Sequence, residues 1–343
     1  MTMPERFLIV SLGSIGRRHL RNLRMLRPDA LIAVWRQSTP VASGETIDGA
    51  DFLFSTLQQA IEFGPAAAIL AGPASTHLPI AIKLAQAGIH LFIEKPVADR
   101  LDGLTELLDF CRQRQLVLMV GYNLRFLPSL NEAKRIVESG SIGDVLSVRA
   151  EVGQYLPDWR PAADYRTGVS AQSALGGGAL LELSHDIDYL CWIFGMPDRV
   201  TARGGRYSRL EIDVEDTAEI LLEYDAPARL VSLHLDMIQR APIRRCRFIG
   251  SEGTVVWDSI GDRIEFYRAS QGSWETMNQF ALTDRNRMYL DELEHFLACV
   301  ASGAVPLTSG EDGRNVLVMV HAARLAMAGG TSVGLEELAQ CAA

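Results

Sequence analysis

The chain has 343 residues, 48% of them hydrophobic, which is the composition of a folded globular protein. This length exceeds that of one ordinary domain, so we expect two domains, each with its own hydrophobic core. The net charge of -9 argues against nucleic acid or an anionic membrane as the main partner. The five cysteines are scattered without a Cys-x-x-Cys pair, which predicts reduced thiols and neither a disulfide framework nor a metal site.

The amino-terminal residues lead directly into an apolar segment and do not resemble a signal peptide. No apolar stretch in the sequence is long enough to span a bilayer. We therefore expect a cytoplasmic protein with no membrane partner.

The first third of the sequence alternates short apolar runs with helical patterns. Continuous apolar runs are typical of strands that are buried on both faces. Their alternation with helices indicates right-handed βαβ units and a doubly wound parallel sheet, which we assign to residues 1–122. The predicted strands are 7–10, 31–35, 66–71, 89–93 and 116–121, and the predicted helices run through Leu20, Leu23 and Leu26, from 78 to 87, and from 101 to 114.

A glycine-rich turn follows the first predicted strand. It reads Ser11-x-Gly13-x-x-Gly16, where a dinucleotide-binding turn has Gly-x-Gly-x-x-Gly, so serine replaces the first glycine. Gly13 would let the backbone approach a pyrophosphate, and Gly16 would let the helix pack closely on the strand. The predicted cofactor contacts here are Gly13, Ser14, Ile15 and Gly16. The alternative is a plain tight turn.

The end of the second strand should show which cofactor the turn binds. An acidic residue there would bind the ribose 2′-hydroxyl of NAD, but the sequence continues as Arg36-Gln-Ser38 with no carboxylate. Arg36 can pair with a 2′-phosphate, and Ser38 can donate a hydrogen bond to it. This pattern favours NADP over NAD, unless Arg36 is simply a solvated loop residue.

Lys95 follows a predicted strand in the run Ile93-Glu94-Lys95-Pro96. Proline cannot continue a central strand, so the chain leaves the sheet here with polar residues at the strand's carboxyl end. Ligands bind at that edge of an open α/β sheet. A lysine placed there is suited to proton transfer or to electrostatic stabilisation, although an ordinary surface lysine would fit the same pattern.

The second part of the chain, residues 123–343, has long alternating strands. In 229–236 the apolar Val231, Leu233 and Leu235 alternate with polar residues, which predicts a sheet with two unlike faces. One face would pack on helices, and the other would be solvated or used for association. The predicted strands are 145–152, 217–224, 229–236, 244–249 and 263–267; the predicted helices are 128–139 and two closing ones, 289–301 and 314–327, which can pack back on the first domain.

Three glycines, Gly176 to Gly178, precede a predicted helix that carries acids and an imidazole. At helical spacing, Glu182, His185 and either Asp188 or Tyr189 share one face. Either carboxylate could orient the imidazole and raise its basicity, as in a catalytic relay. A metal site is a weaker alternative because a second histidine is missing, and a buried core histidine is another alternative.

Taken together, these motifs resemble the Gfo/Idh/MocA family of NAD(P)-dependent oxidoreductases. The resemblance rests on the glycine turn, on Gly72-Pro73-Ala-Ser-Thr-His77, on Glu94-Lys95-Pro96, on Gly121-Tyr122-Asn123-Leu-Arg125-Phe126, and on the glycines that lead to His185. It implies a Rossmann domain followed by an α+β domain with a large, open-faced, mainly antiparallel sheet, which is often a surface of oligomerisation. We therefore expect a homodimer or homotetramer formed through that face.

The resemblance also implies roles for individual residues. Lys95 matches the family's catalytic lysine, and His185 matches its acid or base; Pro73, His77, Glu94 and Lys95 are expected beside the cofactor. The family has an aspartate four residues before the histidine, where this chain has Leu181, and the nearest acid is Glu182. On a helix, one residue corresponds to about a hundred degrees of rotation, so Glu182 would not point where the family's aspartate points. Asp188 or Asp186 is therefore an alternative partner.

Substrate contacts are expected from two further segments. Arginine forks suit carboxylates or phosphates, and aromatic rings stack on sugar faces. The candidates are Tyr122, Arg125, Arg160, Tyr165 and Arg166; the last three could equally pack in a long loop over the sheet.

The expected reaction is hydride transfer between the nicotinamide of NADP or NAD and a secondary alcohol or ketone of a sugar, nucleotide sugar or cyclitol. His185 would take the hydroxyl proton, and Lys95 would hydrogen-bond the alkoxide. Two alternatives stay open: a dinucleotide-binding sensor without catalysis, and transient oxidation during glycoside cleavage.

Overall fold

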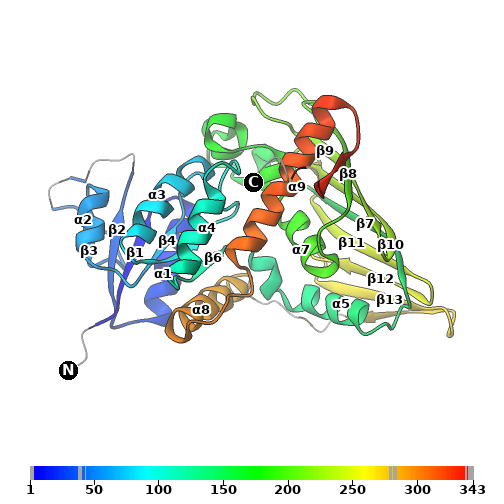
Figure 1. Ribbon diagram of the computed structural model, residues 1–343, viewed down its shortest axis with the longest axis horizontal. Coiled ribbons are helices and arrows are strands. Elements are labelled where there is room, and N and C mark those ends of the chain that lie inside the picture. The colour runs from blue at the N-terminus through cyan, green and yellow to red at the C-terminus, as the bar shows by residue number, and fades with distance from the viewer. Residues whose placement is uncertain are drawn as a thin grey trace. The chain divides into compact units, whose positions relative to one another are not determined.

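The computed structural model describes residues 4–37, 41–42, 44–277, 280, 284–336 and 338 (Figure 1). The chain forms two compact units. The first contains Met1–Asn123 and Arg285–Arg314, and the second contains Leu124–Asp284 and Asn315–Ala343. Each unit is organised around its own sheet.

The first unit contains a six-stranded sheet in the order β3-β2-β1-β4-β5-β6, with every neighbouring pair parallel. Because β1 lies between β2 and β4, the strand order reverses there, which is the place where such sheets bind ligands. The strands are β1 (Arg6–Val10), β2 (Leu31–Trp35), β3 (Phe52–Phe54), β4 (Ala67–Leu70), β5 (His90–Ile93) and β6 (Leu118–Val120).

The helices of the first unit cover this sheet. They are α1 (Ser14–Leu26), α2 (Leu57–Glu62), α3 (Ala74–Gln86), α4 (Leu104–Gln113) and α8 (Arg287–Ser302), with the 3₁₀ turn η1 (Asn123–Phe126) at the boundary with the second unit. Arg18 on α1 stacks over the ring of Tyr289 on α8 at 4.2 Å, and Asn22 exchanges side-chain hydrogen bonds with Asn286. The carboxy-terminal half of the sequence therefore contributes a helix to the first unit.

The second unit contains a nine-stranded sheet in the order β14-β13-β12-β11-β7-β10-β9-β8-β15. The pair β7 and β10 is parallel, and the other pairs are antiparallel. The strands are β7 (Val145–Gly153), β8 (Arg199–Gly205), β9 (Thr217–Asp225), β10 (Ala228–Asp236), β11 (Ile243–Gly250), β12 (Gly253–Asp258), β13 (Arg263–Arg268), β14 (Ser273–Met277) and β15 (Val333–Gly334).

Helices cover one face of this second sheet, where α5 and α7 contact its strands (Figure 1). The side chain of Trp257 on β12 donates a hydrogen bond from Nε1 to Oγ of Ser129 and meets the ring of Tyr189 edge-on at 5.5 Å. The helices are α5 (Pro128–Glu138), α6 (Ala179–Glu182), α7 (His185–Phe194) and α9 (Gly310–Gly329), with 3₁₀ turns η2 (Leu156–Trp159), η3 (Tyr165–Thr167), η4 (Val169–Ala171) and η5 (Ser173–Leu175).

The predicted fold class is confirmed: a parallel Rossmann-type sheet is followed by a mixed, mostly antiparallel one. The prediction of one continuous helix after the three glycines is wrong. The chain forms α6, turns at Leu183 and Ser184, and begins again as α7 at His185. The backbone of Leu183 (φ -97°, ψ 17°) lies outside ordinary α-helical values, which interrupts the helix between Glu182 and His185.

Candidate functional site

The glycine turn joins β1 to α1 tightly. Ser11, in place of the first glycine, has a φ of +73°, a left-handed conformation that glycine adopts without steric cost. Its amide donates to the carbonyl of Trp35 at 2.8 Å. A Cβ on Gly16 would lie 2.2 Å from the Ser11 carbonyl oxygen, so only glycine lets the helix pack this closely.

The amino end of α1 suits a phosphate. Gly13 is the N-cap residue, and a glycine has no side chain that could cap the first N–H groups of the helix. A Cβ at Gly13 would meet nothing within 4 Å, so the space above the turn is open. Ser14 and Ile15 begin the helix, and backbone N–H groups at a helix start favour anions. These residues fit the pyrophosphate of a dinucleotide.

The residues after β2 include an ion pair that the sequence did not indicate. Nη2 of Arg36 lies 2.6 Å from Oε2 of Glu45, which also accepts from the amide of Ala42 at 3.1 Å. The hydrogen bond from Arg36 lowers the pKa of Glu45. An acid is therefore present beside Arg36, supplied by a loop nine positions along the chain. Ser38 lies outside the described residues.

His77 connects two loops at the carboxyl edge of the first sheet. Its Nε2 lies 3.0 Å from the carbonyl oxygen of Gly72, and its Nδ1 lies 3.0 Å from that of Pro96. The ring is buried, and burial lowers its pKa. His77 therefore fixes the loop that carries Lys95 to the turn after β4, in which Pro73 is the N-cap residue of α3.

Lys95 lies half-buried just beyond the carboxyl end of β5. The preceding residue, Glu94, is buried, and its Oε1 lies 2.6 Å from Nε2 of the fully buried His19 on α1. Oε2 of Glu94 accepts from the backbone amide of Lys95 at 3.2 Å. A Cβ on Gly121 would lie 3.0 Å from the same oxygen. The backbone of Lys95 is thus held by a buried acid and imidazole.

In the second unit, the three glycines make room for the start of α6. A Cβ on Gly177 would lie 2.3 Å from the carbonyl oxygen of Val169, and one on Gly178 would lie 2.4 Å from Oε1 of Glu215. That same Glu215 oxygen accepts from the amide of Leu180 at 3.1 Å. The glycines therefore position the segment that leads to His185, which is the half-buried first residue of α7.

The acids near His185 are held by other partners. Glu182 accepts from Oγ of Ser170 at 2.9 Å. Asp188 accepts two hydrogen bonds from one edge of the Arg125 guanidinium, with Nε–Oδ2 at 3.0 Å and Nη2–Oδ1 at 2.7 Å. Because the helix is interrupted between Glu182 and His185, Glu182 does not share a helical face with His185, whereas Asp188 lies one turn after His185 on α7.

Two of the expected substrate contacts are buried. Arg125 is 3% exposed, pairs with Asp188, and stacks over the ring of Trp192 at 5.3 Å. Tyr122 has no exposed surface. This burial argues against direct substrate contact by either side chain, and it assigns Arg125 to holding α7.

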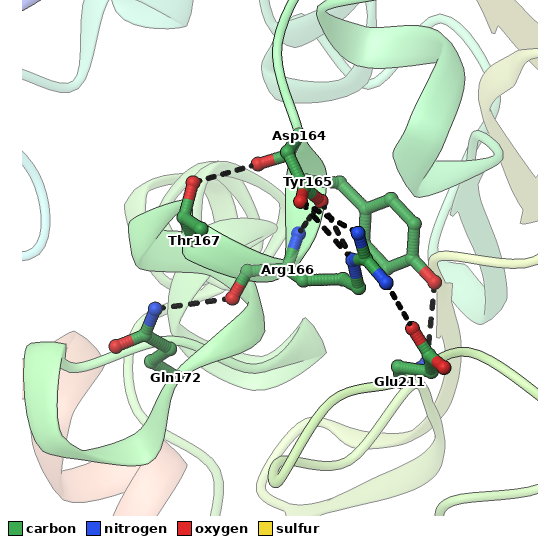
Figure 2. A network of polar contacts seen from close by, with 6 residues as sticks. All are labelled: Asp164, Tyr165, Arg166, Thr167, Gln172 and Glu211. Atoms are coloured by element: carbon green, nitrogen blue, oxygen red, sulfur yellow. Dashed lines mark hydrogen bonds and ion pairs between the residues drawn. The ribbon is translucent and has the colours of Figure 1, made fainter.

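Figure 2 shows the surroundings of two further candidates, Tyr165 and Arg166. Arg166 donates to both carboxylate oxygens of Asp164 and, at 2.8 Å, to Oε2 of Glu211. The hydroxyl of Tyr165 accepts from the amide of Glu211 at 3.2 Å. The Arg166 bonds lower the pKa of Asp164, and the two carboxylates offset the arginine's charge. Both side chains thus connect their loop to the loop between β8 and β9, and Arg160 is exposed.

A pair that the sequence did not indicate lies next to His185. Nε of Arg244 on β11 donates to Oδ2 of the fully buried Asp186 at 3.1 Å. Burial raises the pKa of Asp186, and the charge of Arg244 opposes that effect. Across the described residues, no cluster of histidine, cysteine and acidic side chains could hold a metal ion, and no helix is long and apolar enough to cross a membrane.

Family models match both units. Residues 5–122 match the oxidoreductase family's NAD-binding Rossmann fold, and residues 134–335 match its C-terminal alpha/beta domain. The chain belongs to the Gfo/Idh/MocA family. The resemblance inferred from the motifs is confirmed, and so is the prediction of a dehydrogenase that uses a nicotinamide dinucleotide.

Similar Gfo/Idh/MocA proteins span nearly the whole chain. Myo-inositol 2-dehydrogenase of Thermotoga maritima is 29% identical over 343 residues, covering 96% of this chain and 98% of that protein. A levoglucosan dehydrogenase structure in complex with NADH and L-sorbose gives a TM-score of 0.84 at 22% identity, covering 97% of this chain and 99% of the other. The WlbA dehydrogenase of Bordetella pertussis, in complex with NADH and UDP-GlcNAcA, gives 0.81 at 24% identity with the same coverage.

Proposed function

We propose that this protein transfers a hydride reversibly between a nicotinamide dinucleotide and a secondary alcohol or ketone of a sugar, nucleotide sugar or cyclitol. The observation that carries the proposal is the placement of Lys95 at the carboxyl edge of the first sheet, with its backbone held by the His19–Glu94 pair. That edge is where open α/β sheets bind ligands. Relatives named inositol and levoglucosan dehydrogenases support the substrate class.

In the oxidative direction, the substrate hydroxyl gives its proton to the His185 imidazole, and the ammonium of Lys95 hydrogen-bonds the oxygen as negative charge develops. The carbon–hydrogen bond breaks, and its electron pair leaves with the hydrogen as the carbonyl forms. When bound, the dinucleotide supplies the hydride acceptor at its nicotinamide. Asp188, through Arg125, holds α7 and therefore the position of His185.

Arg36 and Glu45 should decide between NAD and NADP. The arginine alone favours a 2′-phosphate, but a phosphate at Arg36 would also meet the carboxylate of Glu45, 2.6 Å from the guanidinium. A ribose 2′-hydroxyl, in contrast, can donate a hydrogen bond to that carboxylate. We therefore infer that NAD is the better cofactor, and that Arg36 would favour NADP only without its acidic partner.

Fluorescence titration with NADH and NADPH tests this inference. Wild-type protein should bind NADH more tightly, and Glu45→Gln should tighten NADPH binding about tenfold while weakening NADH, since one removed charge contact is worth roughly 1–2 kcal/mol. Arg36→Gln is the matched control and should weaken NADPH in either background. Tighter binding of NADPH than of NADH by the wild type would contradict the inference.

The open face of the second sheet is the surface through which we propose that copies of this chain associate. Leu221 on β9 and Leu230 on β10 are 40% and 47% exposed on that face, among alternating charged residues. Leu230→Glu should dissociate the oligomer, as measured by light scattering. An unchanged mass in Leu230→Glu would contradict the proposal that the chains associate through this face.

Turnover with a substrate panel tests the main proposal. Myo-inositol, levoglucosan and UDP-GlcNAcA, each with NAD and with NADP, should include at least one compound that drives net reduction of the dinucleotide. If a glycoside were cleaved without any net change in nicotinamide absorbance, transient oxidation would replace the proposal. If the dinucleotide bound but no compound were consumed, a sensor would replace it.

A further inference from the structure

Arg244 lies on the face of the second sheet that packs against helices. It sits at the start of β11, and the next residues on the same face, Cys246 and Phe248, are fully buried. Its neighbour across the ladder is Val152, the last buried residue of β7 before Gly153. Arg244 is therefore at the end of the sheet where β7 leads into the loop of residues 154–160.

The bond to Asp186 uses only one edge of the Arg244 guanidinium. Nε donates to Oδ2 of Asp186 at 3.1 Å, and this is the side chain's single hydrogen-bonded partner in the described part of the chain. A guanidinium carries five N–H donors. Asp186 has no exposed surface, whereas 21% of the Arg244 side chain is exposed. The remaining donors are thus available at the surface of the unit.

Asp186 also fixes where those donors lie. It directly follows His185 in the first turn of α7, so the hydrogen bond ties Arg244 to the turn that carries the proposed acid or base. Consecutive Cα atoms are about 3.8 Å apart. Asp186 therefore anchors Arg244 at a Cα that neighbours the Cα of His185.

Of the other arginines considered as substrate contacts, Arg160 is exposed, and two are already paired with acids. Arg166 is offset by the carboxylates of Asp164 and Glu211, and Arg125 is 3% exposed and donates to both oxygens of Asp188. Arg244 is 21% exposed, and Asp186 anchors it to the first turn of α7. A planar guanidinium edge matches the two oxygens of a carboxylate or a phosphate.

We propose that Arg244 binds an oxyanion on the substrate, a carboxylate or a phosphate, and so selects acidic sugars over neutral ones. This rests on the proposed dehydrogenase function and specifies its substrate class. The buried Asp186 holds the guanidinium in place, and the exposed edge makes the contact with the ligand.

Ligand titrations of the NADH-loaded protein test the proposal. The probes are D-glucuronate for the carboxylate, D-glucose 6-phosphate for the phosphate, and D-glucose and myo-inositol as neutral compounds, followed by the change in NADH fluorescence. Wild-type protein should bind one of the two acidic probes at least tenfold more tightly than D-glucose. The probe that binds identifies the oxyanion.

Arg244→Gln should remove this preference while leaving the affinity for D-glucose unchanged, and Arg244→Lys should keep part of it. Since Arg244→Gln leaves Asp186 buried without its cation, the paired variant Asp186→Asn with Arg244→Gln removes both charges and keeps the unit folded. Arg166→Gln is the matched control and should keep the preference.

Three results would overturn the proposal: no acidic preference in the wild type, equal weakening of acidic and neutral probes in the paired variant, or loss of the preference in Arg166→Gln. Failure of the dehydrogenase function has a different signature. In that case NADH fails to bind, or the acidic preference exists without turnover of any compound.

Discussion

Replacing Asp188 with alanine should destabilise the second unit strongly. The side chain has no exposed surface, and it accepts hydrogen bonds at 3.0 and 2.7 Å from Arg125, which is 3% exposed. Its loss removes the carboxylate to which Nε and Nη2 of the buried Arg125 donate. Breaking a buried pair from one side costs about 3–5 kcal/mol, because the remaining ion keeps its desolvation penalty. We expect Asp188→Ala to lower the free energy of unfolding by that amount.

Urea unfolding followed by circular dichroism measures the change. The control is Asp164→Ala, which removes an exposed pair with Arg166 and should cost less than about 1 kcal/mol. The double variant Arg125→Met with Asp188→Leu should cost less than Asp188→Ala alone, since it leaves no uncompensated ion. If Asp188→Ala cost no more than the Asp164 control, the buried pair would not hold α7.

The pH profile of turnover separates this positioning role from a direct one. If Asp188 oriented the His185 imidazole itself, Asp188→Asn would shift the pH at which kcat rises. As the partner of Arg125, it should lower kcat and leave that pH unchanged. A shifted profile in Asp188→Asn, absent from Arg125→Lys, would contradict the assignment.

Three further predictions concern the turn and the second sheet. Ser11→Gly should not lower the free energy of unfolding, whereas Ser11→Val should lower it by about 1–2 kcal/mol, because φ at this position is +73°. Urea unfolding of both variants measures the two free energies. Gly16→Ala should weaken NADH binding in a fluorescence titration, because its Cβ would lie 2.2 Å from the Ser11 carbonyl oxygen. Hydrogen bonds to Asp236 and Glu219 raise the pKa of His234 to about 9. Protonated His234 therefore stabilises the fold fully below its unfolded-state pKa of about 6.5, and this contribution is lost as pH rises through 9. The free energy of unfolding, measured from pH 6 to 10, should show this loss in the wild type and not in His234→Gln.

Much of the fold was predictable because its signals are local. The strands β1 and β2 appear in the sequence as short apolar runs, and β10 appears as a strict alternation of Val231, Leu233 and Leu235 with polar residues. The three-residue β3 and the exposed β14 were not predicted, since neither has enough buried residues to make a periodic pattern.

The chemistry of individual side chains was less predictable, because it depends on partners that are distant in sequence. The sequence placed Lys95 and His185, but it did not show that Glu45 lies beside Arg36, or that Arg244 reaches Asp186 from 58 positions away. The interruption of the helix at Leu183 also changed which acids could serve His185. Arg125 was assigned to the substrate from its motif, and only its burial assigned it to Asp188.

The most direct test of the proposed chemistry is turnover of Lys95→Met and His185→Gln on a substrate identified from the panel. Both variants should stay folded by circular dichroism, and His185→Gln should still bind NADH. The proposed proton transfer and alkoxide stabilisation predict that kcat/KM falls by about 10²–10⁴ in each variant. Full turnover in both variants would show that neither residue takes part in the reaction.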